Sequence, residues 1–300
     1  MPSDIYSDLA ERNEPAFAAG TPYPNNGEGR FLATDYVYCM ISQRARGLSI
    51  GINMNPDGHC NFDCVYCEVD RSKLHGKRGL DIPRMRIELN RMLTMAMTGQ
   101  LRDLTPIHAA HADVMELKEV ALSGDGEPTL SPNFQEAIEA VAHVRAGGRW
   151  PFFKIVLITN CTGLHIPQVR AGIEILTSQD EIWAKLDAGT QRGMDAVNRG
   201  QNIPIQMIMD NIVSLGRQRP VVIQSLFPLV RDQEPPKAEI DAYLQRLREI
   251  RDAGAQIDYV QIYSAHRPAI HQDCGHMPLR SLSAIAHRVR AETDLFAEVF

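Results

Sequence analysis

Apolar runs of strand length alternate with amphipathic helical segments from residue 48 to the end of the chain. The helical segments repeat apolar residues at intervals of three and four positions, and the strand-like runs are nearly continuous in apolar residues. The strand-like runs are residues 48–55, 117–124, 152–160, 181–188, 221–227 and 258–264, with a terminal edge strand at 295–300. The helical segments are residues 81–97, 131–148, 166–176, 204–216, 235–254 and 279–293. This order predicts an α/β fold with a parallel sheet and helices outside it.

Six strand-then-helix units can close as a partial barrel or stay open as a doubly wound sheet. In both architectures ligands gather at the carboxyl ends of the strands, so we expect one shared site there. The segment before the first strand contains TPYPNNGEGR (21–30), which is rich in Pro, Gly and Asn and predicts loop structure. We therefore expect an irregular N-terminal arm over residues 1–47 and a single domain over residues 48–300.

Charge and hydropathy narrow the possible partners. The net charge is −6, which argues against a broad nucleic-acid surface, and neither a signal peptide nor a membrane-length apolar run is found. We expect a cytoplasmic protein that does not bind membranes. Residues 71–91 are a basic exception, with two acids against seven basic residues: Arg71, Lys73, Lys77, Arg78, Arg84, Arg86 and Arg91. This segment is either a solvated surface or a patch for phosphate or carboxylate groups.

Three of the six cysteines lie close together in HCNFDCVYCEVD, directly after the first predicted strand. Cys60, Cys64 and Cys67 have the spacing C-x3-C-x2-C, whereas Cys39, Cys161 and Cys274 are scattered and are expected to be small buried residues. A structural zinc site would need a fourth ligand, such as His59, His75 or a distant cysteine. Three thiolates on one loop favour an iron–sulfur cluster, in which one iron stays open to a ligand.

The cysteine loop resembles the signature of the radical S-adenosylmethionine (SAM) superfamily, C-x3-C-x-Φ-C, with Tyr66 at the aromatic position. The resemblance implies a partial (β/α)6 TIM-like barrel with six parallel strands. It implies that Cys60, Cys64 and Cys67 hold a [4Fe–4S] cluster that reductively cleaves SAM. The resulting 5′-deoxyadenosyl radical would abstract hydrogen from an unidentified substrate. A low-potential electron donor such as flavodoxin or ferredoxin would be the partner.

Further motifs follow the second and third strands. LSGDGEPTL (122–130) resembles the glycine-and-glutamate motif of the family, which implies that Gly126 and Glu127 contact the SAM amino group, with Asp125 nearby. Read alone, the same residues are a turn between a strand and a helix. Asn160 ends the third strand and is expected to face SAM or substrate.

The later strands add polar candidates at their ends. Lys185 and Asp187 share one face of the fourth strand, either as a salt bridge or as contacts to SAM or substrate. Gln224 lies near the end of the fifth strand, and Arg267 after the sixth could hold a carboxylate or a phosphate. A loose C-terminal group fits no strong metal template: His266, His271, Cys274 and His276.

The phrases CNFDCVYC, SGDGEPTL, KLDAGT and VQIYSAHRP are similar to the wyosine-synthase-like Fe–S oxidoreductase branch of the superfamily. That branch includes tRNA-modifying enzymes, whose wyosine-forming members carry additional N-terminal cysteines for a second cluster. Only Cys39 precedes the motif in this chain. We therefore predict a radical SAM enzyme of unassigned substrate. The alternatives are a tRNA-modifying radical SAM enzyme and a non-catalytic zinc-binding module.

Overall fold

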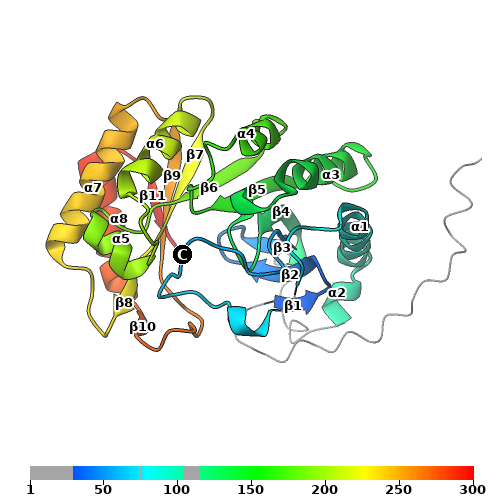
Figure 1. The fold of residues 1–300 in the computed structure, drawn as a ribbon, viewed down its shortest axis with the longest axis horizontal. Helices are drawn as coiled ribbons and strands as arrows, with labels where there is room; N and C mark the ends of the chain where they lie inside the picture. The colour runs from blue at the N-terminus through cyan, green and yellow to red at the C-terminus, as the bar shows by residue number, and fades with distance from the viewer. Residues whose placement is uncertain (1–29, 75, 104–114) are drawn as a thin grey trace, which may run out of the picture.

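The computed structural model describes residues 30–74, 76–103 and 115–300, which form a nine-stranded sheet with helices packed against it (Figure 1). The strand order is β1-β2-β3-β4-β5-β6-β7-β9-β11, and β8 and β10 form a separate antiparallel pair. The strands are β1 (Arg30–Ala33), β2 (Val37–Ser42), β3 (Gly47–Asn53), β4 (Leu117–Ser123), β5 (Lys154–Thr159), β6 (Glu181–Lys185), β7 (Val221–Leu226), β8 (Pro228–Val230), β9 (Ile257–Tyr263), β10 (Cys274–His276) and β11 (Ala297–Val299).

The helices follow the strands in the expected alternation. They are α1 (Ile82–Thr98), α2 (Gln100–Asp103), α3 (Phe134–Ala146), α4 (Pro167–Glu174), α5 (Gln191–Val197), α6 (Ile205–Gly216), α7 (Lys237–Asp252) and α8 (Leu279–Thr293), with 3₁₀ turns η1 (Arg71–Lys73) and η4 (Pro128–Leu130). Among the helices that the structure describes, none is both long enough and apolar enough to cross a bilayer.

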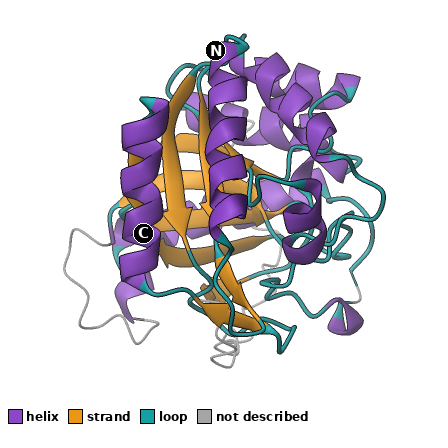
Figure 2. Ribbon diagram, turned by 90° about the vertical axis from the view of Figure 1, so that its left-hand side faces the viewer, coloured by secondary structure: helices purple, strands orange, loops and turns teal. Residues whose placement is uncertain are grey.

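Strands β3, β4, β5, β6, β7 and β9 are neighbours and all run parallel, which confirms the six predicted parallel strands. The terminal run also pairs in parallel, as β11 beside β9. Within the described ranges no pairing joins β1 to β11, so the sheet is a partial barrel with two edges. Figures 1 and 2 show the helices arranged around the outside of this curved sheet.

The two faces of the sheet differ because side chains alternate along each strand. On β4, Val120 and Leu122 join the large apolar core beneath the helices, whereas Ala121 belongs to a small cluster built from strand residues alone. Trp183 of β6 lies in that small cluster, and the buried polar residues Glu119 and Gln224 share its inner face by the same alternation. The inner face is therefore the polar one, and the helices cover the apolar one.

The N-terminal region departs from the irregular arm expected before residue 48. Residues 30–42 form β1 and β2, and β2 pairs antiparallel with β3 along its length. Val37 and Cys39 are fully buried, so this short alternating segment completes the core beside the first parallel strand. Tyr38 lies over Gly51, where a Cβ atom would meet the Tyr38 ring at 2.1 Å. Residues 1–29 lie outside the described part, and a domain boundary at residue 48 stays a prediction.

Three further elements differ from the sequence pattern. Helix α3 begins at Phe134 rather than near residue 131, because the 3₁₀ turn η4 occupies the preceding residues and its first turn is capped by the Glu127 side chain. Helix α5 has seven residues and was not expected, since so short a segment shows little periodicity. The β8–β10 pair likewise has three residues in each strand, below the length at which alternation is visible.

Candidate functional site

The three clustered cysteines lie on the loop over residues 54–70, between the carboxyl end of β3 and η1. Phe62 and Val65 anchor this loop because both side chains are buried in the core. The backbone N–H of Val65 donates to the Val197 carbonyl over 2.8 Å, and that of Met54 donates to Ser123 over 2.8 Å. The loop is thereby fixed both to β4 and to the end of α5.

Each cysteine sulfur on this loop accepts an N–H donor from the chain. The Cys60 sulfur accepts from the Phe62 backbone at 3.4 Å, the Cys64 sulfur from Asn198 Nδ2 at 3.5 Å, and the Cys67 sulfur from Arg71 Nη2 at 4.0 Å. Such donors favour thiolate over thiol and tune the potential of a bound cluster.

Burial acts on these thiols in the opposite direction. It raises the pKa of Cys60 to about 12 and that of Cys64 to about 11, and it also raises the pKa of Cys67. A nearby cation would therefore be needed to deprotonate them, and iron in a cluster is such a cation.

The donor set suits an iron–sulfur cluster because three sulfurs sit on one loop, each with an N–H donor beside it. Over the described ranges no three His, Cys, Asp or Glu side chains form a group that could hold a metal ion. His75, one conceivable fourth zinc ligand, lies outside the described residues. Ligation by Cys60, Cys64 and Cys67 stays a prediction.

Glu127 lies at the end of β4 and is only 3 % exposed. Its Oε1 atom accepts from the Thr129 N–H (3.1 Å), the Thr129 hydroxyl (2.6 Å) and the Thr159 hydroxyl (2.6 Å), and Oε2 accepts from the Asn160 N–H (2.7 Å). The contact between Glu127 and the SAM amino group that the sequence resemblance implies stays a prediction. In the chain as described, the carboxylate joins the ends of β4 and β5.

Gly126 and Asp125 fasten the same turn to the cysteine loop. A Cβ atom on Gly126 would lie 2.1 Å from the His59 carbonyl oxygen, and the next N–H, that of Glu127, donates to this oxygen over 3.0 Å. Asp125 accepts from Asn53 Nδ2 at 2.6 Å. The turn therefore fixes the backbone immediately before Cys60, and only glycine permits so close an approach.

Asn160, directly after the end of β5, also holds the cysteine loop in place. Its Nδ2 donates to Asn61 Oδ1 at 2.8 Å, and its Oδ1 accepts from the Thr162 hydroxyl at 2.7 Å. Because Asn61 follows Cys60 directly, Asn160 holds the cysteine loop against the third parallel strand.

Lys185 and Asp187 form a salt bridge with 3.3 Å between Nζ and Oδ1, the structural reading of this pair. Asp187 also accepts from the Tyr66 hydroxyl at 2.5 Å and from Asn198 Nδ2 at 2.7 Å. Lys185 Nζ donates to the Tyr263 hydroxyl at 3.1 Å. Burial alone would lower the pKa of Lys185, but Asp187 and Tyr263 outweigh it and raise that pKa, so the ammonium stays protonated.

Asn198 was not predicted as a site residue. It is the first residue of the tripeptide NRG (198–200), which follows KLDAGT in the sequence. Its Nδ2 lies within hydrogen-bonding distance of the Cys64 sulfur, the Tyr66 hydroxyl (3.2 Å) and Asp187. Nothing in residue type distinguishes it from other loop asparagines, so only the fold reveals it.

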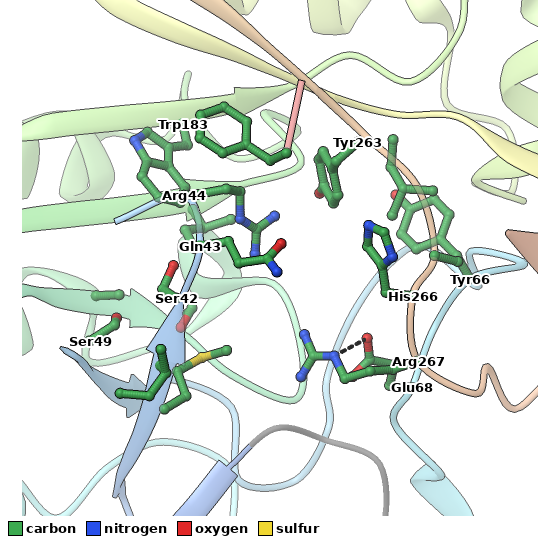
Figure 3. A pocket seen from close by; sticks show the side chains of 18 of the residues that line it. Ser42, Gln43, Arg44, Ser49, Tyr66, Glu68, Trp183, Tyr263, His266 and Arg267 are labelled. Carbon is green, nitrogen blue, oxygen red and sulfur yellow. Dashed lines mark ion pairs between the residues drawn. The ribbon is translucent and has the colours of Figure 1, made fainter. Parts of the chain in front are cut away.

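A cavity of about 560 Å³ opens on the inner face of the sheet, beside the cysteine loop (Figure 3). Among the predicted site residues it is lined by Tyr66, Cys67 and Arg267. The other predicted site residues do not line this cavity: Cys60, Cys64, Asp125, Gly126, Glu127, Asn160, Lys185, Asp187 and Gln224. Further lining residues that the sequence does not mark as candidates include Arg44, Ser49, Glu119 and Trp183, and His266 of the C-terminal group lines the cavity as well.

Gln224 and Arg267 occupy different parts of this region. Gln224 is buried, donating to Gln261 Oε1 at 2.9 Å and accepting from the Tyr263 hydroxyl at 3.1 Å. Arg267 forms an ion pair with Glu68, with 3.2 Å between Nε and Oε1 (Figure 3). It therefore joins the segment after β9 to the residue directly after Cys67.

The C-terminal His and Cys residues divide into separate contacts. His271 lies 3.1 Å from Asp63 and 3.1 Å from Arg199 Nη1, whereas the His266 and His276 rings face each other with centroids 4.3 Å apart. Cys274 is half-buried on β10. These contacts fasten the segment after β9 to the cysteine loop.

Known proteins resemble this chain in sequence and in fold. No protein-family model matches the sequence. A UPF0026 protein of Synechocystis is 31% identical over 186 residues, which is 61% of this chain and 60% of that protein. The chain thus matches about three-fifths of the length of this curated relative.

Solved structures resemble the chain over most of its length. A radical SAM methyltransferase from Sphaerobacter thermophilus has a TM-score of 0.60 and 14% identity, covering 88% of this chain and 68% of that one. TYW1 with a lysine–pyruvate adduct bound has a TM-score of 0.56 and 13% identity, covering 87% of this chain and 86% of that one. The chain is therefore similar to a UPF0026 protein over about three-fifths of its length, and it shares its fold with these two solved structures.

Proposed function

We propose that this chain is a radical SAM enzyme in which Cys60, Cys64 and Cys67 hold a [4Fe–4S] cluster and the adjoining cavity takes SAM and a substrate. One observation carries the proposal: the C-x3-C-x-Tyr-C loop stands at the carboxyl end of the first parallel strand of this fold, and Cys67 lines the cavity. A cluster bound there would supply the low-potential electron that breaks the sulfonium C–S bond of SAM.

The residues around the loop support this chemistry by position. The N–H donors to the three sulfurs stabilise the thiolates, and Asn198 connects Cys64 to Tyr66 and Asp187. Gly126, Glu127 and Asn160 hold the backbone on both sides of Cys60. The half-enclosed inner face limits the access of water, which would favour selective hydrogen abstraction from a bound substrate.

Anaerobic reconstitution with iron and sulfide tests the proposal. The reconstituted chain, given dithionite and SAM, is expected to form 5′-deoxyadenosine, measured by liquid chromatography with mass detection. Cys64→Ser should abolish that product, whereas Cys274→Ser, a half-buried cysteine on β10, should leave it unchanged. Product formation that survives Cys64→Ser would contradict the proposal. Bound zinc without iron would favour the zinc-module alternative instead.

The tRNA-modifying alternative rests on the basic segment over residues 71–91. Lys77, Arg78 and Arg86 are exposed there, and of the described carboxylates none forms an ion pair with them. Binding to bulk tRNA that weakens steeply with salt, and that Lys77→Glu with Arg86→Glu removes, would support this alternative. Absence of binding at low salt would exclude it.

A further inference from the structure

A buried carboxylate with unmet hydrogen-bonding capacity lies on the wall of the cavity. Glu119 of β4 is 1 % exposed and lines the cavity. Its Oε1 atom accepts from the Ser49 hydroxyl at 2.9 Å, but Oε2 has no hydrogen-bond partner in the described part of the chain. A buried polar atom without a partner is unfavourable, so its presence in the wall of a cavity indicates a ligand group that would bind it.

A guanidinium without a counter-ion lines the same cavity. Arg44 comes from the turn between β2 and β3, and its guanidinium lies 4.6 Å from the Tyr263 ring centroid and 5.7 Å from that of Trp183 (Figure 3). In the ranges that the structure covers, no carboxylate lies within ion-pairing distance of Arg44. The guanidinium carbon lies over both rings, and the N–H donors of the guanidinium can bind a carboxylate.

The two charged groups do not neutralise each other directly. Glu119 and Arg44 interact through space but form no ion pair within 4.0 Å. The cation that acts most strongly on Glu119 is Lys154, which is already paired with Glu181 at 2.6 Å, and Arg44 acts more weakly. Besides the paired Glu68 and Arg267, the cavity therefore presents the Glu119 carboxylate and the Arg44 guanidinium, each with capacity for a ligand group of opposite charge.

We propose that this part of the cavity binds a substrate whose inserted end carries both a protonated amine and a carboxylate. The amine would donate to Glu119, and the carboxylate would accept from the edge of Arg44. This inference rests on the proposed function, because it defines the substrate class of the same cavity. The subsite is built from the β2–β3 turn, β3, β4, β6 and β9, and the side chains of Tyr66 and Glu68 from the cysteine loop lie at another part of the wall (Figure 3).

A series of unbranched amino carboxylates measures the distance between the two charges. The probes are glycine, β-alanine, γ-aminobutyrate, 5-aminopentanoate and 6-aminohexanoate, with butyrate and butylamine as singly charged controls. Binding to the purified full chain is followed by ligand-detected NMR without reductant or SAM. One length of the series is expected to bind at least about tenfold more tightly than either control. A series that binds no better than the controls overturns the inference.

Two variants assign that binding to the two residues. Glu119→Gln and Arg44→Met should each weaken binding of the preferred probe by about tenfold, since each removes one charge-assisted interaction. The matched controls are Glu116→Gln and Arg46→Met, because both side chains are exposed and pair with Lys118 and Glu298. Equal binding by all four variants would contradict the inference.

A second readout guards against variants that fail to fold. Only two tryptophans occur, so in Trp150→Phe the emission reports on Trp183 beside Arg44. The preferred probe should change this emission, and thermal unfolding of each variant shows that it is folded. Probe binding without 5′-deoxyadenosine formation would remove the proposed function alone. SAM cleavage without probe binding would remove this inference alone.

Discussion

Glu119 and Glu127 are both buried, one within β4 and one after it, and they differ in how many hydrogen bonds the protein donates to them. Glu127, after the end of β4, accepts four hydrogen bonds from Thr129, Thr159 and Asn160. Glu119, within β4, accepts one from Ser49 and has an unpartnered oxygen within the described chain. The first carboxylate is satisfied by the protein itself, and the second is not.

This difference separates a positioning residue from a candidate ligand-binding residue. A carboxylate whose acceptor capacity is used by its own chain has little left for a ligand unless those bonds rearrange. The resemblance to a family predicts that Glu127 binds a ligand. The unpartnered oxygen of Glu119 within the described chain indicates instead that Glu119 binds one. The comparison can be tested by removing each group in turn.

Glu127→Ala should have the largest effect on stability. It leaves four buried donors without an acceptor at the junction of β4 and β5, so the free energy of unfolding should fall by about 3–5 kcal/mol. Urea denaturation followed by circular dichroism measures the loss. Glu139→Ala, an exposed residue of α3, is the control and should change stability by less than about 0.5 kcal/mol. A small loss for Glu127→Ala would mean that its bonds are easily replaced.

Gly126→Ala should have the next largest effect and lower the free energy of unfolding by about 1–3 kcal/mol. The new methyl group would meet the His59 carbonyl, a backbone atom that cannot move without displacing Cys60. Chemical denaturation and the iron content after reconstitution should both decrease. Gly147→Ala at the end of α3 is the control, because its nearest neighbour is 3.5 Å away and its φ is −63°. Unchanged iron content in Gly126→Ala would show that the turn does not position the loop.

Asn198→Ala should lower stability by about 1 kcal/mol, because it removes the amide that donates to Cys64 and Asp187. Burial raises the pKa of Cys64, and the Asn198 donor opposes that rise, so its removal should raise this pKa further. Alkylation of Cys64 in the cluster-free chain should therefore slow at a given pH. Peptide mass spectrometry reads this rate, with Cys274 as the internal reference. An unchanged Cys64 rate would remove Asn198 from the site.

Glu119→Gln should have the smallest effect on stability, and of opposite sign. Burial raises the pKa of Glu119 above its ordinary 4.5, so the folded chain holds this proton more tightly than the unfolded chain does. The wild-type group therefore lowers stability as pH rises from about 4.5 through its folded-state pKa. The variant should be more stable at pH 7 by up to about 1 kcal/mol, and the difference should shrink toward pH 4. A constant difference across pH would contradict this account.

Much of the fold could be predicted from the sequence because its parallel strands are buried on both faces. Residues 152–160 and 221–227 are almost continuously apolar, and such runs indicate a covered strand without any further context. The β1–β2 extension was missed because it lies next to a Pro- and Gly-rich stretch and its strands are short. Helix α5 was missed because seven residues span only about two turns.

The site could be predicted only where residue type and spacing carry the chemistry. Cys60, Cys64 and Cys67 are marked by their spacing. Strand alternation predicts Lys185 and Asp187 on one face, with a salt bridge as one of two readings; the structure has the salt bridge, although β6 ends at Lys185. Two of the four bonds to Glu127 come from Thr159 and Asn160 at the end of β5, a separate strand, so no local pattern reveals them. Glu119 is an acid within an apolar run, which is a pattern visible in the sequence, but residues at strand ends were predicted instead.

The cysteine loop and the segment after β9 are joined by three contacts. The Ile270 N–H donates to the Cys67 carbonyl over 2.8 Å, His271 lies 3.1 Å from Asp63, and Arg267 pairs with Glu68. His271 and Asp63 are 208 positions apart in the chain. A nascent polypeptide can make these contacts only after the segment over residues 267–271 has also been synthesised. During translation, the cysteine loop therefore leaves the ribosome long before the segment that these contacts attach to it.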